Sequence, residues 1–306
     1  MHLSIIIPIY NEKDNIHNIL QRLTPVCEKI STEYELIFIN DGSKDNSYEI
    51  IKLLAESNPH IKYINFSRNF GHQAAVSAGL DLCSGENVVI IDADLQDPPE
   101  LILEMYAKVQ EGYDVVYAKR NKREGESFFK LLTAKYFYRT LNAITSVDIP
   151  LDTGDFRIMK KSVVNVVKNM PEKNKFLRGQ IAWVGFKQTY VEYNRDQRLA
   201  GETGYTLKKM LKLSMDGITS FSAFPLRVAT WMGFIVSFIS FILIIYALYS
   251  RFISKEYQSG WASIIISVLF IGGVQLMCIG IIGEYISRIF DNVRDRPLYI
   301  IKEKNF

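Results

Sequence analysis

The stretch VVIIDADLQDPPE, from Val88 to Glu100, decides the fold class of this 306-residue chain. It opens with four aliphatic residues that show no polar alternation, a pattern typical of a central strand covered on both faces in a parallel sheet. Asp92 and Asp94 then follow two positions apart, and two prolines end the strand and fix the next turn. The stretch therefore predicts a buried strand that ends at a strongly polar edge.

The two carboxylates of this stretch indicate a site for a divalent cation. While a strand persists, side chains two positions apart leave on the same face, so Asp92 and Asp94 would repel each other unless a cation lay between them or one took up a proton. Gln96 continues the spacing with a neutral oxygen, and such an all-oxygen set suits Mg²⁺ or Mn²⁺ and hardly suits zinc. The alternative is an ordinary strand-end loop whose aspartates cap the following helix.

Other apolar runs of strand length alternate with helical segments. We expect strands at Leu3–Ile9, Tyr34–Asn40, Ile61–Phe66 and Val88–Ile91, with helices at Ile16–Ile30 and up to about Ser57. This alternation implies right-handed crossovers and an α/β fold with a mainly parallel, Rossmann-like sheet, in which ligands bind outside the carboxyl ends of the strands. Three polar clusters fall at those ends: Tyr10–Glu12, Asp41–Ser43 and Asp92–Asp94.

The ligand at this edge is expected to be a nucleotide carried on a divalent metal ion. The chain has no G-x-G-x-x-G after its first strand and no G-x-x-x-x-G-K-[ST], so a dinucleotide or Walker-type triphosphate site is not expected. Tyr10 can pack on a base or ribose, while Glu12 and Asp41 can accept hydrogen bonds from ribose hydroxyls or a uracil-like N–H. Each alone would be read as a helix cap or turn former, but together at one edge they indicate a site.

The C-terminal part has the composition of a membrane protein. Val228–Ser250 and Tyr257–Gly283 contain no Asp, Glu, Lys or Arg, and each exceeds the roughly 20 residues needed to cross a bilayer. A pair of buried core helices is the alternative. We expect a cytoplasmic domain at 1–204, an amphipathic juxtamembrane segment at 205–227, two transmembrane helices within 228–283 (about 228–250 and 260–283), and a cytoplasmic tail at 284–306.

The charges and cysteines of the chain predict its orientation and compartment. Basic residues precede the first span (Lys208, Lys209, Lys212, Arg227) and follow the second (Arg288, Arg294, Arg296, Lys302, Lys304), whereas the connector Arg251–Glu256 holds only Arg251 and Lys255. Positive charge favours both ends in the cytoplasm, in a multi-pass protein of the inner or plasma membrane. The apolar run Leu3–Ile9 is too short for a secretory leader. Three cysteines without metal or disulfide spacing fit a reducing compartment, and a net charge of +3 does not suggest a nucleic-acid partner.

Four motifs in fixed order, PIYNE (8–12), NDGSKDNS (40–47), DADLQDPPE (92–100) and TGDFRIM (153–159), resemble those of the family-2 glycosyltransferases. More narrowly, they resemble the polyprenyl-phosphate glycosyltransferases, which include dolichyl-phosphate mannose synthase and bacterial O-antigen-modifying glucosyltransferases. The segments GGVQLMCIGIIGEYISRIF (272–290) and RPLYII (296–301) are similar to the ending of the bacterial branch with two C-terminal spans. The resemblance covers nearly the whole chain.

This resemblance implies a GT-A fold and roles for particular residues. Pro8, Tyr10, Glu12 and Asp41 would hold the nucleoside, Asp92 would lie beside the donor, and Asp94 and Gln96, with Asp92, would bind Mg²⁺ or Mn²⁺ on its diphosphate. Asp155 stands at the position of the family's catalytic aspartate, with Asp92 as a second catalytic carboxylate, and Arg198 stands in the loop that covers the donor. The sequence GETGY (201–205) departs from the usual Ser-Lys-Tyr-type ending, which puts the contacts of that loop in doubt.

The resemblance also implies a lipid acceptor, which explains the membrane parts. Phe128–Thr145 and Tyr205–Phe221 are typical of amphipathic helices at a membrane surface, although the first would equally suit a plain helix on the sheet. We expect four cations to contact the acceptor phosphate: Arg120, Arg123, Lys130 and Lys135. His72 could also touch a phosphate, but a lone histidine is more often structural.

The activity that follows is the inverting transfer of a sugar from a nucleotide sugar to a polyprenyl phosphate at the cytoplasmic membrane face. The donor is expected to be UDP-glucose or UDP-N-acetylglucosamine, and the product a polyprenyl-phosphate-sugar for cell-wall or O-antigen glycan modification. A flippase and a downstream glycosyltransferase are the expected pathway partners, and a homo-oligomer is compatible with the sequence. The alternatives are a processive polysaccharide synthase, which should carry a Q-x-x-R-W element and more spans, and a membrane-anchored nucleotide-sugar-binding scaffold without turnover, which should lose its metal ligands first.

Overall fold

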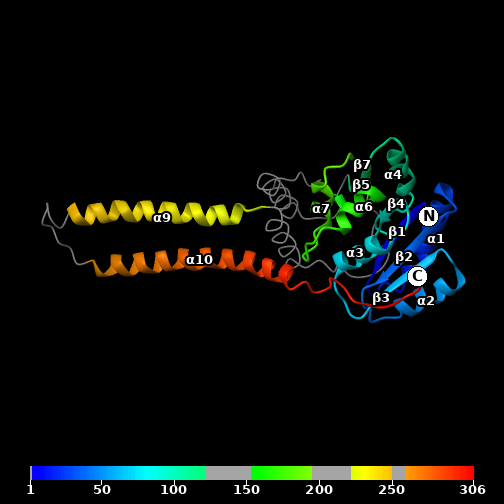
Figure 1. The fold of residues 1–306 in the computed structure, drawn as a ribbon, viewed down its shortest axis with the longest axis horizontal. Coiled ribbons are helices and arrows are strands. Elements are labelled where there is room, and N and C mark those ends of the chain that lie inside the picture. The colour runs from blue at the N-terminus through cyan, green and yellow to red at the C-terminus, as the bar shows by residue number, and fades with distance from the viewer. Residues whose placement is uncertain (1, 121–152, 195–221, 250–259) are drawn as a thin grey trace.

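The computed structural model describes residues 2–120, 153–194, 222–249 and 260–306. Figure 1 shows a sheet domain with helices packed against it, in which both the N-terminus and the C-terminus lie, and two long helices that project from this domain. The architecture is an α/β domain around a mixed, largely parallel sheet, followed by two apolar C-terminal helices, as the sequence predicts.

Four parallel strands form the centre of an eight-stranded sheet. They are β1 (Leu3–Ile9), β2 (Tyr34–Asn40), β3 (Ile61–Phe66) and β4 (Asn87–Ile90), in the spatial order β4-β1-β2-β3. Helices α1 (Ile16–Ile30), α2 (Ser47–Ser57) and α3 (His72–Leu82) connect them, and α4 (Leu101–Gln110) follows β4. These elements confirm the expected ranges, except that β4 begins at Asn87 and ends at Ile90, one residue before the expected strand Val88–Ile91 at each end.

Four further strands extend the sheet to the order β7-β5-β6-β4-β1-β2-β3-β8. They are β5 (Val115–Arg120), β6 (Thr153–Lys160), β7 (Gln188–Tyr193) and β8 (Ile301–Lys304), with helices α6 (Lys161–Lys168) and α7 (Leu177–Trp183) between β6 and β7. β6 is antiparallel to β4 and β5, and β8 is antiparallel to β3. Because β6 runs against β4, its first residues lie beside the carboxyl end of β4, which brings the TGDFR segment to the polar edge.

Both faces of the sheet are buried, which explains the unbroken aliphatic runs of its strands. Ile5 and Ile7 of β1 pack on one face with apolar residues of α1, α2 and α4. Ile6, between them, packs on the other face with residues of α3, α6 and α7. Because successive side chains of a strand point to opposite faces, a strand covered on both sides is apolar at most of its positions, with few buried polar exceptions such as Ser4 and Glu35.

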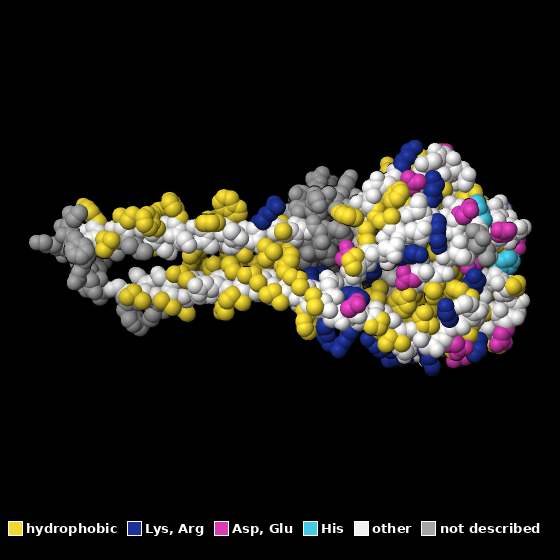
Figure 2. All heavy atoms as spheres, in the orientation of Figure 1, with side chains coloured by type: hydrophobic (Ala, Val, Ile, Leu, Met, Phe, Trp, Pro, Cys, Tyr) yellow, Lys and Arg dark blue, Asp and Glu magenta, His cyan; other side chains and the backbone are white. Residues whose placement is uncertain are grey.

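Two helices, α9 (Phe224–Tyr249) and α10 (Trp261–Val293), are long and apolar enough to cross a membrane. Most of their apolar side chains are exposed, and Figure 2 shows such side chains along both helices, with Lys and Arg side chains where the helices meet the sheet domain. A pair of buried core helices does not fit this exposure, whereas a lipid environment does. α10 continues past the expected end at Gly283 to Val293. The segment 205–221 and the connector 251–256 lie outside the described residues, so the domain limits and the orientation stay predictions.

Candidate active site

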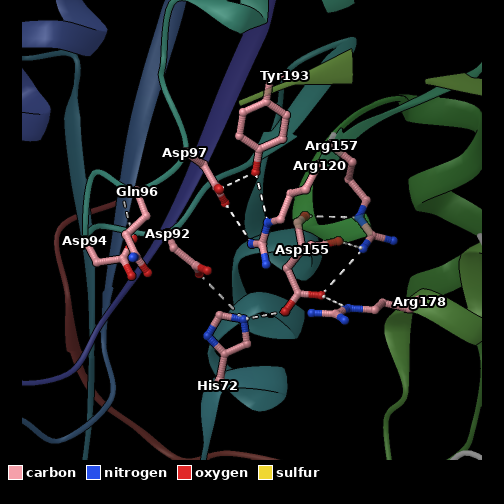
Figure 3. Close-up of polar contacts among 11 residues, drawn as sticks. His72, Asp92, Asp94, Gln96, Asp97, Arg120, Asp155, Arg157, Arg178 and Tyr193 are labelled. Atoms are coloured by element: carbon pink, nitrogen blue, oxygen red, sulfur yellow. Dashed lines mark hydrogen bonds and ion pairs between the residues drawn. The ribbon is translucent and has the colours of Figure 1, made fainter. Parts of the chain in front are cut away.

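Asp92 and Asp155 meet at the carboxyl edge of the sheet. Asp92 follows the end of β4, Asp155 lies near the start of β6, and the two strands pair at Ile90 and Arg157. His72, the first residue of α3, lies between the two carboxylates. Figure 3 shows these three side chains converging, with Arg178 of α7 on the other side of Asp155.

Asp155 is buried and surrounded by cations. Its Oδ1 accepts a hydrogen bond from Arg178 Nε at 2.8 Å, and its Oδ2 lies 3.1 Å from His72 Nε2. The buried Arg157 donates from Nε to the backbone oxygen of Asp155 at 3.0 Å, and its Nη2 lies 3.5 Å from Oδ1. Burial by itself would raise the pKa of Asp155, but Arg178 and His72 outweigh it and hold that pKa well below its usual value. This carboxylate therefore stays ionised at neutral pH and is poorly suited to take up a proton.

His72 bridges the two carboxylates. Its Nε2 lies 3.1 Å from Asp155 Oδ2 and 3.8 Å from Asp92 Oδ1, and 36% of its side chain is exposed. Burial lowers the pKa of His72, but Asp92 and Asp155 raise it to about 9. The imidazole is therefore a cation at neutral pH. The sequence alone favoured a structural histidine, whereas the structure places it in the centre of the charged cluster.

Asp92 lies where negative charges accumulate. Partial burial and the carboxylates of Asp155, Asp94 and Asp97 raise the pKa of Asp92 to about 6, although His72 opposes this shift. The Asp92 side chain is 32% exposed. The negative charge gathered around Asp92 favours a further positive charge nearby, which a divalent cation or a substrate could supply.

Asp94 and Gln96 lie together on a turn beside Asp92. Asp94 is buried, and its Oδ1 accepts a hydrogen bond from the backbone N–H of Gln96 at 3.2 Å. Because β4 ends at Ile90 and Leu95 adopts a left-handed φ of 57°, the same-face spacing of an extended strand does not continue through this turn. Figure 3 shows Asp92 turned toward His72, and Asp94 and Gln96 side by side.

These three residues fit a cation that brings further oxygen ligands with it. Within the described part of the chain, no three or more His, Cys, Asp or Glu side chains are grouped so that they could hold a metal ion by themselves. Asp92, Asp94 and Gln96 nevertheless offer oxygen ligands on one short turn, with excess negative charge at Asp92. That donor set suits Mg²⁺ or Mn²⁺ carried on a diphosphate, since these ions usually keep phosphate or water ligands.

The residues predicted to bind the nucleoside lie at one edge of the sheet. Pro8 is buried within β1, Tyr10 is 43% exposed, and Glu12 accepts a hydrogen bond from Asn15 Nδ2 at 2.6 Å. The buried Asp41 accepts hydrogen bonds from the backbone N–H groups of Phe70 and Gly71 at 2.6 and 2.9 Å, so its carboxylate anchors the loop before α3. The polar clusters after β1 and β2 do meet, because the backbone N–H of Asn11 donates to Ser43 Oγ at 3.0 Å. The nucleoside contacts of these residues stay predictions.

Arg120 is the one predicted acceptor cation that lies within the described residues, and it is held in a second cluster. Its Nη2 lies 3.5 Å from Asp97 Oδ2, and its Nε donates to the Tyr193 hydroxyl at 3.1 Å. Tyr193 in turn donates to the other oxygen of Asp97. Gly154 lies directly against this guanidinium, since a Cβ at that position would come within 2.7 Å of Arg120 Nη2 and the arginine would have to shift. Arg120 thus neutralises a buried aspartate, a role that the sequence did not indicate.

The remaining predicted site residues cannot be placed. Arg123, Lys130, Lys135 and Arg198 lie outside the described residues, as do the segments Phe128–Thr145 and Tyr205–Phe221. Conversely, the contacts of Arg178, Asp97 and Tyr193 were missed, because each joins distant parts of the chain. Arg157 belongs to the quoted motif TGDFRIM, so its presence in the site was signalled, although its role was not.

Comparison with known proteins gives two family matches. The description "Glycosyl transferase family 2" matches residues 4–167, and "GtrB C-terminal hairpin" matches residues 224–289. The first match covers most of the sheet domain but ends before α7 and β7, whereas the second covers α9 and most of α10, the two long helices of Figure 1.

Several relatives match almost the whole chain. The uncharacterized glycosyltransferase YkcC of Bacillus subtilis (strain 168) is 54% identical over 300 residues, which are 98% of this chain and 93% of the relative. The bactoprenol glucosyl transferase of Shigella phage SfII is 42% identical over 305 residues, 100% of this chain and 99% of the relative. Among solved structures, glucosyl-3-phosphoglycerate synthase from Mycobacterium tuberculosis, in complex with Mn²⁺, UDP and glucosyl-3-phosphoglycerate, has a TM-score of 0.46 and 18% identity over 71% of this chain and 77% of that chain.

Proposed function

The chain belongs to glycosyltransferase family 2, and from this premise we propose that it transfers glucose from UDP-glucose to a polyprenyl phosphate at the cytoplasmic face of a membrane. One observation carries the proposal: a single chain holds a charged cluster at the carboxyl edge of its sheet and two exposed apolar helices beside it. A soluble acceptor would not require those helices. Several of the full-length relatives are named bactoprenol glucosyl transferases, and these names support glucose over N-acetylglucosamine.

The reaction is a single displacement at the anomeric carbon. An oxygen of the acceptor phosphate forms a bond to C1 of glucose, the bond from C1 to the β-phosphate oxygen breaks, and UDP leaves with the electron pair. An α-linked donor then yields a β-linked product. The second pKa of a phosphate monoester is about 6, so the acceptor is mostly a dianion at neutral pH and needs no general base.

Asp155 acts in this proposal by orienting cations and not by removing a proton. Its pKa is held far below neutrality, first of all by Arg178, which overcomes the opposing effect of burial. In return, Asp155 fixes Arg178 Nε at 2.8 Å and holds a proton on His72 Nε2 at 3.1 Å. Charges preorganised in this way stabilise the negative charge that develops as a phosphate leaves.

Asp94, Gln96 and Asp92 would hold Mg²⁺ or Mn²⁺ on the diphosphate of the donor. When bound, the cation would neutralise charge on the leaving group. Tyr10, Glu12 and Asp41 would bind the nucleoside from the neighbouring strand ends. Both sets of residues follow the carboxyl ends of neighbouring parallel strands, which supports this assignment.

The product would carry its sugar on the cytoplasmic side, still attached to a membrane lipid. A flippase would have to move it across the bilayer, and a second glycosyltransferase would have to use it as a donor for a cell-wall or O-antigen glycan. We include both as pathway partners, together with a multi-pass location in the inner or plasma membrane. A homo-oligomer is compatible with the exposed apolar surface of α9 and α10.

The test is transfer of label from a nucleotide sugar to lipid. The purified chain in lipid nanodiscs would be given undecaprenyl phosphate and radiolabelled UDP-glucose, with Mg²⁺, with Mn²⁺ or with chelator, and label would be counted in the organic phase. Parallel assays with UDP-N-acetylglucosamine and UDP-galactose identify the sugar. We expect metal-dependent labelling by UDP-glucose, which Asp155→Asn should abolish. Folded protein that labels lipid with none of these donors would contradict the proposal.

A further inference from the structure

The chain returns to the sheet domain after the second apolar helix. α10 ends at Val293, Asp295 adopts a left-handed φ of 47°, and β8 then pairs antiparallel with β3. Lys173 holds the turn, because its Nζ lies 2.6 Å from Asp295 Oδ1 and its backbone N–H donates to Asn292 Oδ1 at 2.9 Å. The membrane helix is thus joined to the sheet domain both at this turn and at β8.

Glu303 holds β8 against α2 and β3 by side-chain hydrogen bonds. Its carboxylate accepts hydrogen bonds from Tyr48 Oη at 2.5 Å, Tyr63 Oη at 2.8 Å and Lys52 Nζ at 3.0 Å. Hydrogen bonds from these groups lower the pKa of Glu303 to about 2, and the one from Tyr48 has the largest effect. One carboxylate therefore connects β8 to both α2 and β3. This connection adds to the backbone pairing of β8 with β3.

The residues directly before and after β8 also contact the sheet domain. Before β8, the Tyr299 ring stacks on Phe66 with centroids 5.1 Å apart, and the Tyr299 hydroxyl donates to Asp81 of α3 at 2.7 Å. After β8, Asn305 Oδ1 accepts a hydrogen bond from the backbone N–H of Tyr63 at 2.7 Å. The whole segment from Tyr299 to Asn305 is therefore held against the edge of the sheet.

The strand that β8 covers leads directly into the active site. β3 ends at Phe66, and the next residue, Ser67, donates its backbone N–H to the Ile300 oxygen at 3.0 Å. The loop then runs to Gly71, where Asp41 binds it, and α3 begins at His72. The chain that leaves the membrane helix is therefore in contact with the loop that positions His72.

From these contacts we propose that β8, with Glu303 as its positioning residue, holds the active site at a fixed height and tilt over the bilayer, so that a phosphate carried on a membrane lipid can reach it. This inference rests on the proposed function. A soluble donor reaches the site by diffusion at any tilt of the domain, whereas a lipid-held phosphate reaches only a site that is kept close to the headgroups. An edge strand such as β8 also pairs with the backbone N–H and C=O groups of β3 that would otherwise be exposed. Loss of that purely structural role would change the Michaelis constants of donor and acceptor alike.

The experiment compares two acceptors in nanodiscs: undecaprenyl phosphate in the bilayer and a short, water-soluble prenyl phosphate. The variant is Glu303→Ala, and the matched control is Lys302→Ala, which changes an exposed side chain of the same strand. For Glu303→Ala we expect the Michaelis constant for undecaprenyl phosphate to rise roughly tenfold or more, as the loss of charge-assisted hydrogen bonds implies. The constants for UDP-glucose and for the soluble acceptor, and all values of the control, should stay within about twofold of wild type.

Other outcomes separate this inference from the proposed function. If Glu303→Ala raises the constants for both acceptors and for UDP-glucose equally, β8 supports the domain in general and the inference is wrong. It is also wrong if no constant changes in Glu303→Ala while wild type uses both acceptors. If wild type uses neither acceptor, the proposed function fails and this inference fails with it. If Glu303→Ala does not fold, Tyr299→Phe, which loses the hydrogen bond to Asp81, takes its place. Its Michaelis constants for the two acceptors and for UDP-glucose are then compared in the same way.

Discussion

Arg178 Nε donates a hydrogen bond to Asp155 Oδ1 at 2.8 Å, so a residue of α7 orients a carboxylate of β6 that lies 23 positions earlier in the chain. His72 contacts the other oxygen of the same carboxylate at 3.1 Å. A buried carboxylate between two cations has one favoured orientation, because any rotation leaves a buried charge without its partner. The direction in which Asp155 points is therefore decided by residues outside its own motif.

Replacing Arg178 should lower the rate of sugar transfer. We expect Arg178→Gln to reduce kcat by about 100-fold, because a preorganised charge beside the reacting groups is lost. Arg178→Lys should retain part of the rate, since it keeps the charge but not the planar donor geometry. Steady-state kinetics with UDP-glucose and undecaprenyl phosphate measure both. Lys108→Gln, which removes an exposed ion pair of α4, is the control. A rate for Arg178→Gln equal to that of this control would contradict the role.

Removing an oxygen ligand should abolish turnover without unfolding the protein. Asp94→Ala deprives the expected Mg²⁺ or Mn²⁺ of a carboxylate, and Asp92→Ala should do similar damage. A chelator should inactivate wild type reversibly. Activity against metal concentration, with circular dichroism as the test of folding, checks all three results. Near wild-type rates of Asp94→Ala at ordinary metal concentrations would remove the metal assignment.

Neutralising Arg120 should destabilise the fold. The structure ties Arg120 to Asp97, whose side chain is 1% exposed, so Arg120→Gln leaves a buried carboxylate without its cation. Losing one partner of a buried pair costs about 3–5 kcal/mol, and Arg120 is 21% exposed, so the lower end of that range is expected. The double variant Arg120→Gln with Asp97→Asn should recover much of the loss. Thermal unfolding midpoints in detergent provide the comparison, and additive losses in the double variant would show that the two residues act independently.

Acid should release β8 from β3. Because Tyr48, Lys52 and Tyr63 lower the pKa of Glu303 from 4.5 to about 2, its ionised form is favoured in the folded protein. The sign follows from this direction: the stabilisation is fully present above pH 4.5 and is lost as pH falls toward 2. Hydrogen exchange at the β3 amides, measured across this range, should therefore speed up with acid. Glu303→Gln should flatten the dependence, and an unchanged slope in that variant would assign the effect to other groups.

Both chain ends should lie in the cytoplasm. Arg227 lies in the first turn of α9, and Arg294 directly follows α10. Figure 2 shows Lys and Arg side chains where the two helices meet the sheet domain, the distribution expected of a cytoplasmic side. A cysteine placed at Ser254, which lies outside the described residues, should react with an impermeant reagent in intact cells. A cysteine placed at Ser57, an exposed residue of the sheet domain, should react only after lysis. The reverse pattern of labelling would invert the topology.

The sequence by itself determined the elements and the edge of the sheet that carries the site. The apolar runs of β1, β2 and β3 end where predicted, because a strand buried on both faces is mostly apolar. The two long helices follow from uncharged stretches, since charged side chains are costly in a bilayer. The polar clusters after β1, β2 and β4 had to meet, because parallel strands share one carboxyl edge.

Only the tertiary structure decided which polar groups meet. Asp155 contacts His72 across 83 positions of sequence, and Glu303 contacts Tyr48 across 255. These pairs depend on the antiparallel placement of β6 and β8, which no local pattern in the chain reports. Hydrophobic periodicity indicates whether a residue is buried but not which neighbour it faces. The orientation of Asp155, the pairing of Arg120 with Asp97 and the attachment of the chain end to β3 therefore became visible only in the folded protein.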